Sequence, residues 1–99
     1  MSLEGDFALA LEETVKEARK AGYNPHYFDQ MLQEHGGVET ARRLIAKSEP
    51  QTGLFELYRR RMLDTSMEAV MLQDKFRPLF THEELAEAHK RLDELDYFK

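Results

Sequence analysis

The placement of glycine and proline constrains the fold of this chain more than any other feature of its sequence. All three prolines and all five glycines lie between segments with helical spacing, and none lies inside such a segment. Because these two residues destabilise a helix interior more than any other residue does, they mark where helices end. No segment has the apolar–polar alternation of a convincing strand. The pattern predicts an all-α fold.

Two helices are expected in the first third of the chain. The first covers about residues 6–21, with Asp6 as its N-cap and Gly22 just after its last turn. The second covers about residues 25–35. Asn24 is a good N-cap for it, and a proline at the first helical position has a backbone angle that already suits a helix.

The middle of the chain is less strongly divided. A third helix is expected over about residues 38–47, followed by a proline-containing loop at 48–51. The segment Leu54–Phe76 is either one long helix, because no glycine or proline interrupts it, or two helices divided near its centre. A capping box formed by Thr65 and Glu68 favours the division. Glu68 also lies within an apolar run, so it is either the partner of Thr65 or a buried acid with a functional role.

The last third of the chain contains the clearest helix start. The helix after the break, about residues 66–75, is apolar around most of its circumference, which indicates a central or covered position. The final helix begins at a second capping box, made by Thr81 and Glu84. Glu87 and Arg91 are expected to pair on its outer face. Its apolar residues follow a narrow seam: Leu85, Ala88, Leu92 and Leu95.

We therefore expect an all-α domain, a compact orthogonal or bundle-like array of five to six short helices. It is predicted to cover residues 6–99, with residues 1–5 as an N-terminal leader or a disordered segment. The predicted core consists of Leu11, Val15, Phe28, Met31, Leu32, Leu44, Ile45, Leu54, Leu57, Val70, Leu72, Phe76, Leu79, Phe80, Leu85 and Leu92.

The charge and composition exclude several classes of function. The 99 residues carry a net charge of −5, so the chain lacks the positive charge that attracts nucleic acid or anionic membranes. It contains no cysteine, which excludes disulfides, cysteine zinc sites and thiol catalysis. No apolar run approaches the roughly 20 residues that span a bilayer. We expect a cytoplasmic protein that does not associate with membranes.

Residues spread over about three quarters of the chain resemble a known pattern. They are Tyr23, Pro25, Phe28, Met31, Leu32, Gly36, Gly37, Val38, Ala41, Leu44 and Ile45, then Gly53, Leu54, Leu57, Leu63, Asp64, Ser66, Glu68, Val70, Phe76, Leu79, Phe80, Glu84, Ala88, Arg91 and Leu92. This pattern resembles a small helical region of uncharacterised bacterial proteins, a domain of unknown function. The resemblance implies a bacterial origin and a helical domain, and it brings no catalytic residue, ligand or partner.

The residue types that carry enzyme chemistry are present without the required spacing. His82 and His89 share a helix face, but seven residues correspond to about 10 Å of rise, too far for one metal ion with bonds of about 2 Å. The sequence has no His-Glu-x-x-His motif, no Gly-x-Ser-x-Gly motif and no phosphate-binding glycine loop. We therefore expect no catalytic residue, no metal and no cofactor, and we predict that the protein is not an enzyme.

A run of basic residues is the main indication of nucleic-acid binding. Arg59, Arg60 and Arg61 are consecutive, but neighbouring helical residues point about 100° apart, so they cannot all face one groove. Arg42 and Arg43 could extend the patch if the third and fourth helices are adjacent. These five arginines are the candidate nucleic-acid contacts, and a solvated or salt-bridged surface is the simpler interpretation.

Protein interaction is the remaining class of function. Met62, Met67 and Met71 lie close together in the sequence and could form an adaptable apolar surface. Tyr97 and Phe98 could add the aromatic anchors that interfaces favour. The expected function is a non-catalytic interaction or accessory module that binds an unknown protein partner or a second copy of itself. A helical domain that contacts nucleic acid through its arginines is the alternative.

Overall fold

The computed structural model describes residues 2–47 and 52–99, and these residues form helices and turns without any strand. The α-helices are α1 (Leu3–Lys20), α2 (His26–His35), α3 (Gly37–Ile45), α4 (Thr52–Arg59), α5 (Met67–Met71) and α6 (His82–Asp93). Two short 3₁₀ helices, η1 (Leu63–Thr65) and η2 (Arg77–Leu79), connect the later ones. The prediction of an all-α fold is confirmed.

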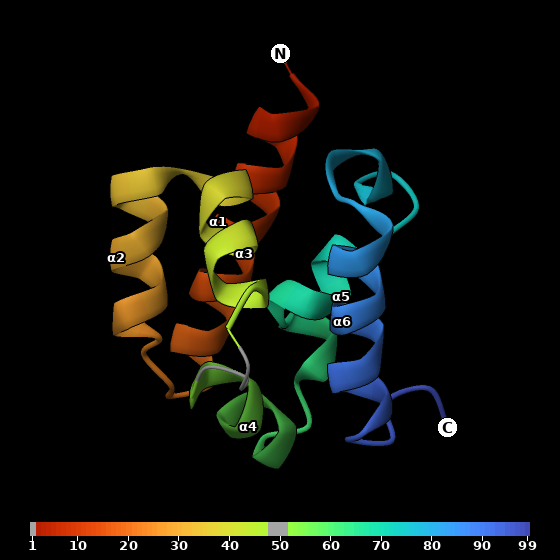
Figure 1. Cartoon of the computed structure of the whole chain (residues 1–99). Coiled ribbons are helices and arrows are strands. Elements are labelled where there is room, and N and C mark those ends of the chain that lie inside the picture. Colours follow the sequence, from red (N-terminus) through yellow and green to blue (C-terminus); the bar gives the residue numbers. More distant parts are fainter. Residues whose placement is uncertain (1, 48–51) are drawn as a thin grey trace.

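The short helix α5 occupies the centre of the molecule (Figure 1). It packs against α1 on one side and against α6 on the other. Helices α1, α2 and α3 pack on one another, and α3 also contacts α6. Helix α4 lies at one end of the molecule and contacts η1. None of the described helices is long and apolar enough to cross a bilayer.

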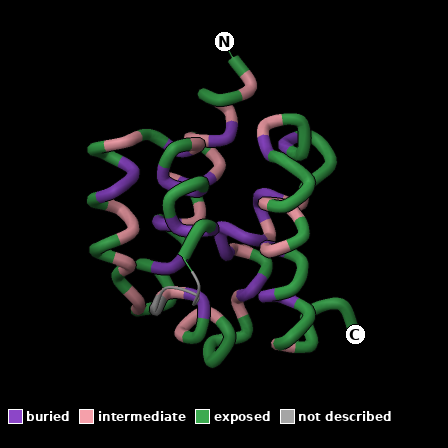
Figure 2. The backbone as a smooth tube through the Cα atoms, in the orientation of Figure 1, coloured by how far each residue is buried: buried purple, intermediate pink, exposed green. Residues whose placement is uncertain are grey.

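The core lies where α1, α3, α5 and α6 meet, and buried segments converge there in Figure 2. Phe7 of α1 is fully buried, and its ring meets the rings of Phe76 and Phe80 edge to face, each at a centroid distance of 5.2 Å. The predicted core does not include Phe7, so the prediction is corrected here: Phe7 lies at the centre of the core.

Most of the predicted core is buried as expected. The buried residues are Leu11, Val15, Met31, Leu32, Leu44, Ile45, Leu54, Val70, Phe76, Phe80 and Leu92. The others pack against the core while keeping part of their surface in solvent: Phe28, Leu57, Leu72, Leu79 and Leu85.

Helix α1 begins three residues earlier than predicted. Ser2 is its N-cap, because the Ser2 hydroxyl accepts a hydrogen bond from the Gly5 amide at 3.0 Å. The proposed cap, Asp6, already lies within the helix, and its carboxylate is 3.6 Å from the ammonium group of Lys75. Residues 3–5 therefore form the first turn of the helix and are not disordered.

The predicted cap of α2 is also wrong. Pro25 occupies the N-cap position, and no side chain caps this helix end. The Asn24 side chain instead accepts a hydrogen bond from Arg19 Nε at 3.1 Å, which ties it to the end of α1. In contrast, the capping box of α6 is confirmed, since both hydrogen bonds between Thr81 and Glu84 form, at 2.8 and 3.1 Å.

The segment Leu54–Phe76 is not one long helix, because it contains most of α4, then η1, then α5. The predicted break is confirmed, but the cap of α5 is Ser66 instead of Thr65, because the Ser66 hydroxyl accepts a hydrogen bond from the Ala69 amide at 3.1 Å. Glu68 is therefore not part of a capping box. Helix α5 ends at Met71, four residues before its predicted end, and the chain continues in turns to η2.

Three helices end with the same hydrogen-bond pattern, the Schellman motif, in which an amide beyond the helix end donates to a carbonyl five residues earlier. The donor–acceptor pairs are Tyr23 to Ala18, Met62 to Leu57 and Tyr97 to Leu92, at 2.9, 2.8 and 3.0 Å. The residue before each donor has a left-handed backbone: Gly22 (φ 90°), Arg61 (φ 58°) and Asp96 (φ 61°). Only the first of these ends coincides with a glycine.

Candidate functional site

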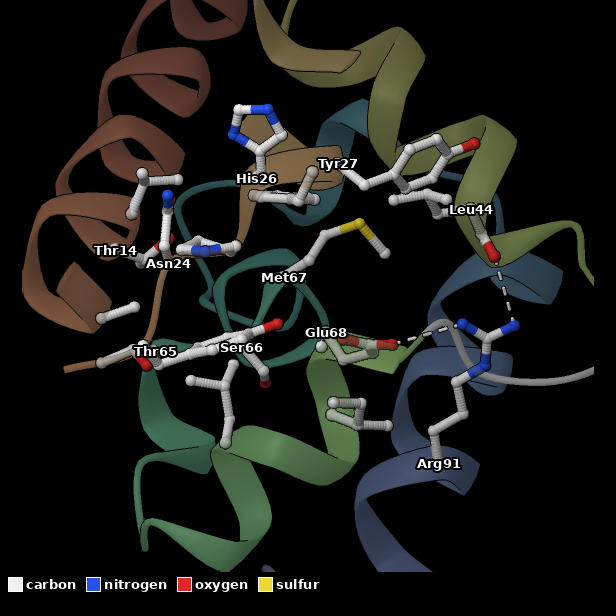
Figure 3. A pocket seen from close by; sticks show the side chains of 18 residues that line it. Thr14, Asn24, His26, Tyr27, Leu44, Thr65, Ser66, Met67, Glu68 and Arg91 are labelled. Atoms are coloured by element: carbon white, nitrogen blue, oxygen red, sulfur yellow. Dashed lines mark hydrogen bonds and ion pairs between the residues drawn. The ribbon is translucent and has the colours of Figure 1, made fainter. Parts of the chain in front are cut away.

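A cleft of about 340 Å³ opens between the end of α1, the start of α2, and helices α4 and α5 (Figure 3). Its walls are largely apolar and include Val15, Leu54, Leu57 and Met67. Tyr27 also lines the cleft, with 60% of its surface exposed. A cleft of this volume is large enough to receive one or a few side chains of a partner or a small ligand.

A carboxylate lies at the base of this cleft. Glu68 comes from α5, and only 6% of its side chain is exposed. Its Oε2 accepts a hydrogen bond from Arg91 Nη1 at 3.2 Å, and the Arg91 side chain is 1% exposed (Figure 3). A buried ion pair thus connects α5 to α6 beneath the apolar walls.

Arg91 also holds the end of α3. Its Nη2 donates to the backbone carbonyls of Leu44, Ile45 and Lys47, at 3.3, 3.3 and 2.8 Å. The last carbonyls of a helix have no partner within the helix and form the negative end of its dipole, so a guanidinium there is stabilising. Arg91 Nε donates to Glu87 Oε2 at 2.8 Å. One cation therefore serves two carboxylates and a helix end.

This role of Arg91 corrects the predicted position of the Glu87–Arg91 pair. The pair forms, but Arg91 lies inside the molecule instead of on the outer face of the helix. Two sequence signals point to the buried position. Arg91 lies three residues after Ala88 and four before Leu95, on the side of the apolar seam, and the acidic Glu68 within an apolar run needs a cationic partner.

The surroundings of Glu68 raise the pKa of its carboxyl group above the ordinary value of 4.5. The largest cause is burial, which disfavours the charged form, and the nearby Glu87 carboxylate acts in the same direction. A hydrogen bond from the Glu68 backbone and the charge of Arg91 act in the opposite direction without cancelling the effect. The other titratable side chains that line the cleft are Tyr23, His26 and Tyr27.

This raised pKa predicts a specific pH dependence of stability. The folded protein holds the Glu68 proton more tightly than the unfolded chain does, so the contribution of Glu68 is fully present below pH 4.5 and is lost as the pH rises through the folded-state pKa. Urea unfolding of the wild type and of Glu68→Gln, followed by circular dichroism from pH 4 to 8, should show the wild type losing stability relative to the variant over that window. A relative gain of the wild type with rising pH would contradict the prediction.

The first two candidate arginines lie on α3 and contact the protein itself. Arg42 Nη2 donates to the Leu79 carbonyl at 3.0 Å, and its Nε is 3.9 Å from Glu84 Oε2. Arg43 pairs with Glu39 on the same helix, at 2.8 Å. The contacts of Arg42 are thus with η2 and the start of α6.

The other three candidate arginines lie at the end of α4. Arg59 and Arg60 both pair with Glu56, at 3.1 and 2.7 Å. Arg60 also donates to the Ala21 carbonyl at 2.8 Å and lies over the ring of Tyr23, 5.6 Å from its centroid. Arg61 adopts the left-handed backbone at the end of α4. This group therefore contacts the end of α1, not the elements that Arg42 contacts.

The candidate interaction residues are divided between the core and the surface. Met71 is fully buried and Met67 is buried at the cleft, because α5 is enclosed by α1 and α6, so the predicted methionine surface does not exist at these two positions. Met62 is half-buried. Tyr97 and Phe98 are exposed, and the Phe98 ring stacks on His89 with a centroid distance of 4.3 Å.

Comparisons with protein-family models, with curated proteins and with solved structures give no match. Within residues 2–47 and 52–99, no group of three histidine, aspartate or glutamate side chains is placed to hold a metal ion. The cleft and the ion pair at its base are therefore the features from which a function can be argued.

Proposed function

We propose that this domain is a non-catalytic protein-interaction module and that its cleft receives apolar side chains of a partner protein. The observation that carries the proposal is the cleft itself, a cavity of about 340 Å³ with largely apolar walls that opens to the surface. Apolar surface that stays uncovered in a folded domain gains free energy when a partner covers it, at about 25 cal/mol per Å².

The residue types at the rim of the cleft favour a protein as the binding partner. Tyr27 lines the cleft and remains mostly exposed, and tyrosine is among the residues that interfaces favour, because it offers a large apolar ring with a polar tip. Phe55 and Tyr58 are exposed on α4, the helix that supplies part of the cleft wall.

The hydroxyl groups in the cleft favour binding over catalysis. Ser66 Oγ donates to the Leu63 carbonyl at 2.6 Å, and Thr65 Oγ1 donates to the Met62 carbonyl at 2.7 Å. A nucleophilic hydroxyl instead needs a hydrogen bond to a general base that accepts its proton. These two hydroxyl groups therefore shape the chain before α5. The hydroxyl of Thr14, which also lines the cleft, donates to the Leu11 carbonyl at 2.7 Å.

Photo-crosslinking in the source cells tests the proposal. A benzoylphenylalanine at Tyr27, on the rim, should give a discrete crosslinked protein. The same group at Leu9, which is 58% exposed on α1 and is not a cleft residue, is the matched control and should give none. The mass of the crosslinked product separates a different protein from a second copy of this chain. Equal crosslinking from both positions, or none from Tyr27, would reject the cleft as the interaction surface.

A further inference from the structure

We propose that the group entering the cleft is a basic side chain, a lysine or arginine of the partner segment, with its aliphatic stem against the apolar walls and its charged end at Glu68. This inference rests on the proposed function, because it assumes that the cleft is the binding surface. The inference adds which chemical group of the partner enters the cleft.

The charges at the base of the cleft favour a cation. Two carboxylates, Glu68 in the cleft and Glu87 beyond its lining, share the single guanidinium of Arg91, so the three side chains carry one negative charge in excess when both carboxyl groups are ionised. The same guanidinium also serves the carbonyls at the end of α3. The raised pKa of Glu68 is consistent with this count, since it means that Arg91 does not fully compensate the buried carboxylate.

The hydrogen-bonding capacity at the base favours a donor. Each nitrogen of Arg91 already donates within the protein, and in the described part of the chain only one of its five N–H groups, on Nη1, is left for an anionic ligand. A carboxylate, in contrast, can accept about four hydrogen bonds, and Glu68 Oε2 accepts one from Arg91. A lysine ammonium or an arginine guanidinium offers only donors, which matches this remaining capacity.

The walls fit the rest of such a side chain. Lysine and arginine carry three or four methylene groups below the charge, and these groups favour apolar surroundings such as Leu54, Leu57 and Met67. The rings of Tyr23 and Tyr27 also line the cleft, and a cation is attracted to the face of an aromatic ring. The net charge of −5 on the whole chain attracts basic partners over longer distances.

Three small probes of equal chain length test the inference on the purified protein. Hexylammonium, 1-hexanol and hexanoate are titrated at pH 7.5 while the backbone amides are followed by ¹⁵N–¹H NMR. We expect hexylammonium to shift the amides of Tyr23, Leu57, Met67 and Glu68. It should bind about tenfold more tightly than 1-hexanol, because a hydrogen bond between two charged groups is stronger than one from a neutral hydroxyl. Hexanoate should bind most weakly.

A matched pair of variants assigns the preference to Glu68. Glu68→Gln keeps the shape of the side chain and should remove the preference for hexylammonium while keeping the binding of 1-hexanol. Glu13→Gln removes an exposed carboxylate of α1, and the preference should persist. Persistence of the preference in Glu68→Gln would overturn the inference. If that variant does not fold, the comparison of the three probes on the wild type still decides the charge of the occupant.

The outcomes separate this inference from the proposed function. Equal binding of 1-hexanol and hexylammonium at the cleft amides would reject the basic side chain and retain an apolar binding cleft. Tighter binding of hexanoate would also reject it. No shift of the cleft amides with any of the three probes would reject both proposals.

Discussion

The Arg91→Met variant should be less stable than the wild type by about 3–5 kcal/mol, which is the cost of breaking a buried ion pair on one side. The loss leaves the Glu68 carboxylate buried without its cation, and it also leaves the last carbonyls of α3 without their donor. Methionine is similar in length to the arginine stem, so the change removes charge and hydrogen bonds more than volume. Urea unfolding followed by circular dichroism measures the difference.

Arg43→Met is the matched control for this variant. Arg43 and Arg91 each pair with a glutamate four residues earlier at 2.8 Å, but the pair of Arg43 is on the surface. Exposed ion pairs contribute at most about 1 kcal/mol to the free energy of unfolding, so Arg43→Met should cost no more than that. A double variant, Glu68→Met with Arg91→Met, should recover part of the stability because no unpaired buried charge remains between them. Equal losses for Arg43→Met and Arg91→Met would contradict the central role assigned to Arg91.

The second large effect is expected for Phe7→Ala, which should lower the free energy of unfolding by about 3–5 kcal/mol. The Phe7 ring is fully buried between the rings of Phe76 and Phe80, which belong to the turns on either side of η2. Removing it opens a cavity that the surrounding rings cannot fill without moving. Thermal and urea unfolding of the variant measure the loss.

Leu9→Ala on the same helix supplies the comparison. Leu9 is two residues away and mostly exposed, so the change should alter stability by no more than about 0.5 kcal/mol. If Phe7→Ala costs no more than Leu9→Ala, the three phenylalanine rings do not form the packed centre that their distances describe.

Local sequence rules predict the helices well because the apolar spacing of each helix is a local property. They are weaker for helix ends, where several residues compete. Both Ser2 and Asp6 are good caps, and local preference does not choose between them. For the same reason α5 is capped by Ser66 and not by Thr65, since two adjacent hydroxyl residues are both suitable caps.

Helix ends without glycine are harder to predict. Arg61 and Asp96 adopt left-handed backbones that usually favour glycine. Aspartate enters this conformation more often than most residues, but arginine has no such preference. Packing of the preceding helices against the core stabilises these ends in place of local preference. The sequence therefore leaves one long helix as an alternative to a break after α4, whereas it predicts the stop at Gly22 directly.

The candidate site could be predicted only in part. The sequence indicates Glu68, because an acid within an apolar run is unusual. It does not indicate the partner, because Arg91 lies 23 residues away and the α3 carbonyls lie more than 40 residues from Arg91. Periodicity within one helix gives no information about which helix faces it. Residues from each of the helices α1 to α6 line the cleft, so its shape is a property of the tertiary packing alone.

The ion pair also restricts how α6 can dock. The leucines and alanine along α6 would make acceptable contacts after a slide of one helical turn, because one apolar side chain can replace another. Such a slide moves every residue by about 5.4 Å, which would take Arg91 out of reach of Glu68 and of the α3 carbonyls at once. A single guanidinium thus fixes the position of α6 along its own axis relative to α3 and α5. Apolar contacts alone do not select one such position.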